Sequence, residues 1–142
     1  MSEKVLLVDD EKDFLEAMSE RMKSRDMEVT TASSAKEALE KIEYETFDAI
    51  VLDFQMPGMD GMEALKSMKT KQPESQIILL TGYATVEKTV EAMKIGAADF
   101  LEKPADLEIL SQKIKQAKAE KILIVKKQQE KRVIDIIKKY GA

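Results

Sequence analysis

The sequence lacks two residue types on which many protein sites depend. Its 142 residues include no cysteine, so disulfide bonds and thiolate metal sites are excluded. Histidine is also absent, which removes the commonest general base and the usual zinc ligand. No apolar run approaches the roughly 18 residues of a membrane span, and the first four residues lead straight into a strand-like run rather than a signal peptide. The sequence predicts a soluble, cytoplasmic protein with no membrane segment.

Charge is spread unevenly along the chain. Residues 1–104 hold 13 Lys/Arg against 22 Asp/Glu, a net charge of −9, whereas residues 105–142 hold 10 against 5, a net charge of +5. This change in composition places a boundary near Pro104. The chain is long enough for one domain with a core of its own.

A strand-like run ends in an acidic residue near the middle of the chain. Residues 50–52 are apolar and mostly β-branched, which is typical of a strand buried in a parallel sheet. Pro57 and Gly58 then predict a turn. We therefore expect Asp53 at the carboxyl edge of a sheet, where open α/β folds carry their sites.

Strand-like and helix-like segments alternate along residues 4–106. The expected strands are 4–8, 27–31, 48–52, 76–81 and 98–101, and a helical pattern follows each of them. Helices about ten residues long between strands indicate repeated βαβ units and a parallel sheet. The predicted fold is therefore α/β, a doubly wound five-stranded sheet of flavodoxin-like order 2-1-3-4-5.

Several residues mark where individual helices lie. The expected core stripe of the first helix is Phe14, Ala17, Met18 and Met22, which recur at helical spacing. Ser33 or Ser34 can cap the second helix, since Glu37 stands three residues after Ser34 as a capping box requires. Gly96 is expected to end the fourth helix.

Polar residues follow the ends of the expected strands. Right-handed crossovers bring all five ends to one edge, which gathers Asp9, Asp10, Asp53, Thr81 and Lys103. Three carboxylates in one cleft repel each other, and a hard cation such as Mg²⁺ relieves the repulsion. Lysine and threonine can each bind a phosphate oxygen. The cluster therefore makes one of its carboxylates a candidate nucleophile toward phosphorus.

Four segments together resemble the receiver domain of two-component response regulators. The segments are residues 8–11, 52–61, 80–82 and 100–104, that is VDDE, LDFQMPGMDG, LTG and FLEKP, and the match covers residues 4 to about 118 in the right order and spacing. The resemblance implies a response regulator that accepts a phosphoryl group from a sensor histidine kinase with Mg²⁺. It also implies signalling through protein–protein contacts or dimerisation, and no enzymatic activity beyond self-phosphorylation and autodephosphorylation.

The resemblance assigns the phosphoacceptor and the metal ligands. Asp53 is the implied phosphoacceptor. Asp10, Asp53 and the backbone carbonyl of Gln55 are implied ligands of Mg²⁺, and Asp9 is implied to act through a metal-bound water.

The resemblance also implies roles for residues around the phosphoryl group. Thr81 and Lys103 would bind its oxygens, the peptide bond after Lys103 would be cis, and Phe100 would be a rotameric switch together with Thr81. Leu15 is expected to be exposed beside the acidic pocket, where the family's kinases dock. Tyr83 is bulky enough to obstruct an attacking water, so we expect a rather long-lived phosphoryl group.

A Mg²⁺-dependent phosphohydrolase of similar fold is the alternative function. Such an enzyme would need a second acid two residues after its nucleophile to protonate the leaving group. Gln55 occupies that position here, which favours the receiver function.

The end of the chain predicts one long helix. No Gly or Pro interrupts residues 105–140, and apolar positions recur about every 3.67 residues, which is a helical period. An unbroken helix over 106–139 would be roughly 50 Å long at ~1.5 Å per residue. Receiver domains usually end earlier, so we divide the chain into a receiver domain, 1–119, and a helical extension, 120–142. The stripe consists of Leu107, Leu110, Ile114, Lys118, Ile122, Val125, Gln129, Val133, Ile136 and Tyr140.

The apolar stripe of this helix predicts a partner. The receiver body alone cannot bury it, so a homodimer through the C-terminal helix is expected, although a frayed or bent tail is an alternative. Glu120, Glu130 and Asp135 interrupt the basic face, which argues against direct binding to nucleic acid or to a membrane.

Overall fold

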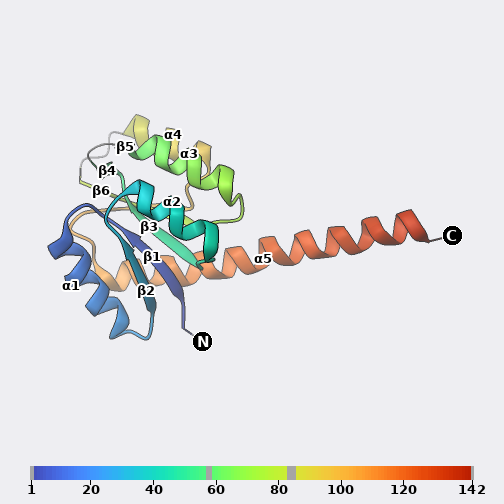
Figure 1. The fold of residues 1–142 in the computed structure, drawn as a ribbon, viewed down its shortest axis with the longest axis horizontal. Helices are drawn as coiled ribbons and strands as arrows, with labels where there is room; N and C mark the ends of the chain where they lie inside the picture. The colour runs from blue at the N-terminus through green and yellow to red at the C-terminus, as the bar shows by residue number, and fades with distance from the viewer. Residues whose placement is uncertain (1, 57–58, 83–85, 142) are drawn as a thin grey trace.

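The computed structural model describes residues 2–56, 59–82 and 86–141 and contains a five-stranded parallel sheet (Figure 1). The strands are β1 Lys4–Val8, β2 Glu28–Ala32, β3 Ala49–Asp53, β6 Ile77–Thr81 and β7 Asp99–Glu102. They pair in the order β2-β1-β3-β6-β7. This is the order 2-1-3-4-5 in chain sequence, so the predicted flavodoxin-like fold is confirmed.

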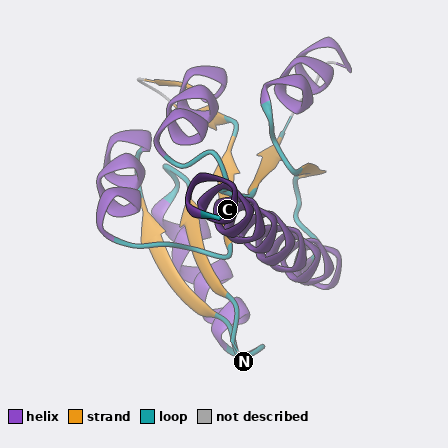
Figure 2. Cartoon of the chain, turned by 90° about the vertical axis from the view of Figure 1, so that its right-hand side faces the viewer, coloured by secondary structure: helices purple, strands orange, loops and turns teal. Residues whose placement is uncertain are grey.

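Helices cover both faces of the sheet (Figure 2). The core on one face contains residues of α1 and α5, and the core on the other face contains residues of α2, α3 and α4. The helices are α1 Lys12–Lys23, α2 Ala35–Tyr44, α3 Gly61–Lys71, α4 Val86–Ile95 and α5 Leu107–Tyr140.

The central strands alternate between the two cores. In β1, Val5 and Leu7 face the core under α1 and α5, whereas Leu6 and Val8 face the opposite core. All four side chains are fully buried. A strand buried on both faces needs a continuous apolar run, which is why the sequence pattern identified it.

A short antiparallel pair stands where the sequence predicted only a turn. The strands β4, Gln55–Met56, and β5, Met59–Asp60, pair directly after Asp53. The predicted turn residues Pro57 and Gly58 lie outside the described residues.

The buried face of α1 is rotated by one position from the predicted stripe, and only Met18 and Met22 belong to both. Leu15 is only 7% exposed and belongs to the core, whereas Ala17 is exposed and Phe14 is partly buried at the border of the core. The predicted exposure of Leu15 is therefore wrong, and the kinase-docking role loses the exposure on which it depended. The reason is that the following residues share one face at the spacing i, i+3, i+4, i+7. They are Leu15, Met18, Ser19 and Met22.

A side-chain cap begins α2. The Ser34 hydroxyl oxygen accepts a hydrogen bond from the N–H of Glu37 at 3.1 Å, as predicted. The Glu37 carboxylate accepts from the N–H of Ser33 at 3.0 Å and from its hydroxyl at 2.9 Å. These bonds from Ser33 hold the pKa of Glu37 below its usual value.

Substitution Ser34→Ala is expected to lower the free energy of unfolding by about 1 kcal/mol, because the N–H of Glu37 loses its acceptor. Urea denaturation monitored by circular dichroism measures the change. The control is Ser67→Ala within α3, where alanine favours the helix and no loss of stability is expected.

Helix α5 is one continuous helix of 34 residues, as predicted, and it extends far beyond the sheet (Figure 1). The Asp106 side chain caps its first turn by accepting from the N–H groups of Glu108 and Ile109. Its buried residues are Leu110, Ser111, Ile114 and Ala117. Further along, Lys121 donates to the carbonyl oxygen of Phe47 at 2.6 Å, which marks where the helix leaves the body. Within the described ranges, no helix combines the length and the apolar character that a membrane span requires.

Candidate functional site

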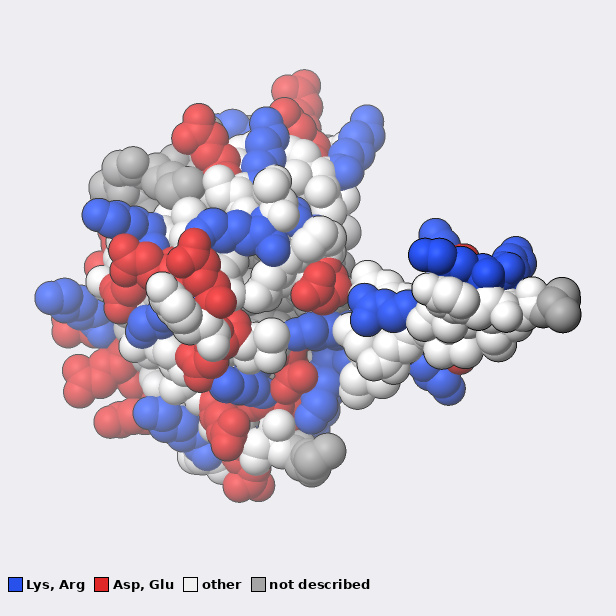
Figure 3. Space-filling view, turned by 45° about the vertical axis from the view of Figure 1, so that its right-hand side comes forward, with Lys and Arg blue, Asp and Glu red and all other residues white. Residues whose placement is uncertain are grey.

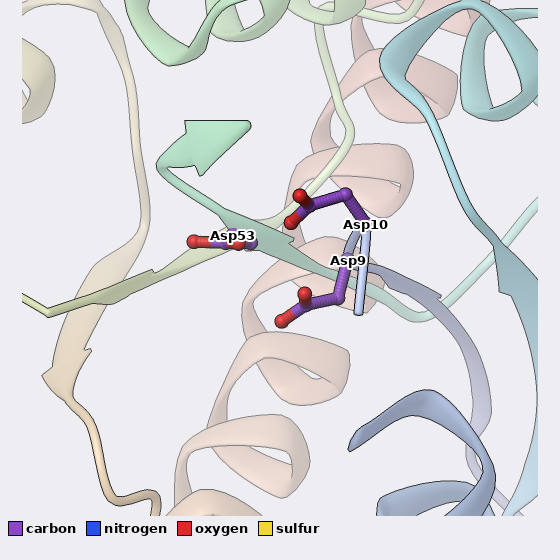
Figure 4. Close-up of side chains that lie close together, drawn as sticks. All are labelled: Asp9, Asp10 and Asp53. Carbon is purple, nitrogen blue, oxygen red and sulfur yellow. The ribbon is translucent and has the colours of Figure 1, made fainter. Parts of the chain in front are cut away.

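Three carboxylates meet at the carboxyl edge of the sheet (Figure 4). Asp53 is the last residue of β3, and Asp9 and Asp10 follow β1 directly. One oxygen from each lies within 4.8 Å of the others. Asp9 is 0% exposed and Asp53 is 4% exposed, whereas Asp10 is open to solvent. The adjacent parallel strands thus bring together Asp10 and Asp53, which are 43 positions apart in the sequence, as predicted from topology.

Protein groups engage both oxygens of the buried Asp9 carboxylate. Its Oδ1 accepts from the N–H of Glu11 at 2.9 Å, and its Oδ2 accepts from Lys103 Nζ at 2.9 Å. A buried carboxylate requires such partners because the loss of hydration is costly. These two hydrogen bonds fix the position of the Asp9 carboxylate at the site.

Lys103 brings the positive charge to the site. Its Nζ lies 3.5 Å from Asp53 Oδ2 as well as 2.9 Å from Asp9 Oδ2. Burial on its own lowers the pKa of Lys103, but the hydrogen bond to Asp9 and the charges of Asp53 and Glu11 outweigh burial and raise that pKa above its usual value. The Lys103 side chain is thus a protonated ammonium at neutral pH. The peptide bond between Lys103 and Pro104 is cis, as the sequence resemblance implied.

Thr81 supplies a buried hydroxyl at the end of β6. The residue is 2% exposed, and its Oγ1 has no hydrogen-bond partner among the residues that the structure describes. Its neighbour Leu80 pairs with Asp53 in the sheet, so the hydroxyl lies at the same edge as the acidic cluster. A buried hydroxyl without a partner costs roughly 1–3 kcal/mol, and a ligand oxygen placed there would remove that cost.

Substitution Thr81→Val is expected to raise the free energy of unfolding by about 1 kcal/mol, because a methyl group replaces a hydroxyl that has no hydrogen-bond partner among the described residues. Urea denaturation of the unphosphorylated protein gives the difference. The control is Ser75→Ala, which removes a buried hydroxyl that donates to Gln72 O at 2.7 Å and should be destabilising. A clear loss of stability in Thr81→Val would show that the hydroxyl has a partner.

The remaining predicted residues are described to different extents. Phe100 lies on β7 with 37% of its surface exposed and belongs to neither core cluster of the described residues, so its switch role stays a prediction. Gln55 lies in β4, but its side chain lies outside the description, and its carbonyl as a metal ligand stays a prediction. Tyr83 lies outside the described residues.

One contact at the site was missed from the sequence. The Lys103 ammonium lies 4.8 Å from the centre of the Phe14 ring. The sequence assigned Phe14 to the core stripe of its helix. The signal that could have revealed its contact with Lys103 is an aromatic residue in the first helical turn after an acidic pair.

The donor set of the site fits Mg²⁺. Three carboxylates face a single lysine, which leaves excess negative charge, and every candidate ligand atom in the cluster is a hard oxygen. Magnesium prefers oxygen ligands and binds through a few carboxylates together with phosphate. The arrangement can thus hold a divalent cation and a phosphoryl group side by side.

Comparisons with known proteins agree with this geometry. The family model described as the response regulator receiver domain matches residues 5–115. Response regulator protein FleR of Pseudomonas aeruginosa is 39% identical over 110 residues, covering 78% of this chain and 23% of FleR. The chain thus spans about a quarter of the length of that relative.

Solved structures give the same result. A response regulator receiver domain protein from Clostridium thermocellum has a TM-score of 0.81 and 33% identity, covering 87% of this chain and 99% of that chain. The beryllofluoride-activated NtrC4 receiver domain dimer has a TM-score of 0.78 and 37% identity, covering 83% of this chain and 98% of that chain. The protein thus has the phosphoryl-acceptor function of two-component signalling. The chain belongs to the family of response regulator receiver domains.

Proposed function

We propose that Asp53 accepts the phosphoryl group, that a sensor histidine kinase in the cytoplasm donates it, and that Mg²⁺ is required. The observation that supports this assignment most directly is the surroundings of Asp53. Its carboxylate belongs to the acidic cluster, it lies 3.5 Å from the Lys103 ammonium, and the buried hydroxyl of Thr81 is at the same edge of the sheet.

Each residue has a distinct part in the proposed transfer. An Asp53 carboxylate oxygen forms a bond to phosphorus while the bond from phosphorus to the donor's nitrogen or oxygen breaks, and the leaving group keeps that electron pair. The Lys103 ammonium and the Thr81 hydroxyl then donate to the phosphoryl oxygens, so the buried hydroxyl gains an acceptor. A phosphoryl group on Asp53 therefore changes the partners of both residues.

Asp10, Asp53 and the Gln55 carbonyl would hold the metal ion, with Asp9 acting through a water. A bound Mg²⁺ would supply charge neutralisation between the carboxylates and the incoming phosphoryl oxygens. Asp9 suits an indirect role because protein donors already engage both of its oxygens.

Incubation with acetyl phosphate and Mg²⁺, followed by intact-mass measurement, tests the proposed chemistry. We expect the mass gain of one phosphoryl group, and no gain when EDTA removes the metal ion. Labelling that persists undiminished in EDTA would contradict the requirement for Mg²⁺.

The proposed signal passes through the surface of β7 and α5. When Thr81 turns toward the phosphoryl group, Phe100 on the adjacent strand can rotate into the space that it leaves, which is a packing change driven by a local charge. Helix α5 starts directly beyond β7 and carries that change away from the site.

We further propose that the receiver domain spans 1–119, that 120–142 is a helical extension, and that two copies of the chain pair through it. Large apolar side chains on the projecting half of α5 are about half exposed or more. Figure 3 shows uncharged surface along this part of the helix beside a group of Lys and Arg. A monomer rarely exposes so much contiguous apolar surface. The exposed residues are Ile122, Leu123, Val133, Ile134, Ile136, Ile137 and Tyr140.

A further inference from the structure

Phe14 and Lys103 come from distant parts of the chain and meet beside the acidic cluster. Phe14 lies in the first turn of α1, and Lys103 follows β7. The ring is partly buried and packs against the same core as the partly buried Leu101 and Leu107, which fixes its position on one side. The ammonium lies 4.8 Å from the ring centre, within the range of a cation–π contact.

The Lys103 side chain has a second possible orientation, toward Glu11. Phe14 and Lys103 line a groove of about 260 Å³, which also contains Glu11 and Arg21. Glu11 is a third anion that attracts the ammonium, besides Asp9 and Asp53. The lysine stem has four rotatable bonds, so a lysine without the ring could turn toward Glu11 and solvent.

We propose that Phe14 is a positioning residue, which holds the Lys103 ammonium where it meets the phosphoryl group on Asp53. The inference rests on the proposed role of Asp53. The carboxylates of Asp9 and Asp53 also hold the ammonium, but a cation bound between them would weaken their attraction for it. The attraction of the neutral Phe14 ring for the ammonium does not depend on whether a cation is bound.

Fluorinated phenylalanines at position 14 test the inference with little change in shape. Each added fluorine weakens the negative face of the ring, so the rate of labelling by acetyl phosphate and Mg²⁺ should fall stepwise along the series. The fully fluorinated ring and Phe14→Leu should each slow labelling about three- to tenfold. Phe14→Trp keeps an aromatic ring and should keep most of the wild-type rate. Circular dichroism should show that every variant of the fluorine series stays folded.

A measurement without metal or phosphodonor gives a second readout. In the metal-free protein, the ring current of Phe14 should shift the methylene proton signals of Lys103 upfield in NMR spectra. Phe14→Leu should abolish that shift. An unchanged shift in Phe14→Leu would overturn the inference, because the ring would not face the lysine stem.

Phe47 provides a matched control. Its ring is buried and lies 5.5 Å from Lys4 Nζ at the opposite edge of the sheet. The same fluorine series at Phe47 should leave the labelling rate unchanged, and equal slowing in both series would overturn the inference. A flat series at Phe14 would also overturn it, while labelling of the wild type would leave the role of Asp53 intact. If the wild type itself gains no phosphoryl group, the proposed function fails instead.

Discussion

Substitution Asp53→Asn should abolish labelling by acetyl phosphate and Mg²⁺, with no mass gain above background. The amide is nearly isosteric with the carboxylate, but it carries no charge and cannot form an acyl phosphate. It also removes one of the three carboxylates that would attract the metal ion. Intact-mass measurement over time checks the result, and circular dichroism establishes that the variant is folded.

Asp99→Asn is the matched control for this experiment. Asp99 is a half-buried carboxylate that pairs with Lys113 Nζ at 2.7 Å, and it begins β7 at the opposite edge of the sheet. The Asp99→Asn variant should gain a phosphoryl group to the same extent as the wild type. If Asp53→Asn still gains one phosphoryl group to the same extent, another residue is the acceptor.

Topology explains why the acidic cluster and its lysine could be predicted from the sequence. Once the apolar runs were identified as parallel strands, the residues after each run had to share one edge of the sheet. The structure places Asp9, Asp53, Thr81 and Lys103 there, and the contacts of Lys103 with both carboxylates follow from that placement. The prediction required only strand ends, which the polar residues mark clearly.

Side-chain orientation on α1 could not be predicted in the same way. Phe14 and Leu15 are both apolar, so the sequence allows two neighbouring core faces. The structure buries Leu15 and leaves Phe14 at the border, where the ring meets Lys103. That contact joins residues 89 positions apart, and no local pattern specifies it.

The body buries only the first part of α5, although the sequence pattern runs along the whole helix. Burial ends at Ala117, and the contact of Lys121 with Phe47 is near the limit of the body. Helix length could be predicted because no Gly or Pro interrupts the segment. The fraction of the stripe that the body covers depends on the size of the sheet, which the local sequence does not encode.

Removal of the residues after Ala119 should convert a dimer into a monomer. The full chain should have the mass of a dimer in light scattering at high micromolar concentration, and the shortened chain that of one copy. Burying a large aliphatic side chain contributes about 1.5–3 kcal/mol, and the apolar positions of two helices together can exceed the cost of association. Beryllofluoride tests whether pairing depends on the state of Asp53.

A double substitution distinguishes loss of the apolar stripe from a general effect of truncation. Val133 is 55% exposed and Ile136 is 52% exposed, and both lie on the stripe, so Val133→Glu combined with Ile136→Glu should give a monomer with an intact receiver domain. Asp135→Lys changes a charge on the side of the helix away from the exposed apolar residues and should leave the dimer intact. The 11-residue interval between Ile122 and Val133 equals that between Val125 and Ile136, so the stripe stays on one side of a nearly straight helix. Two such helices can pair along their whole projecting length, and a full chain that stays monomeric with and without beryllofluoride would show that they do not.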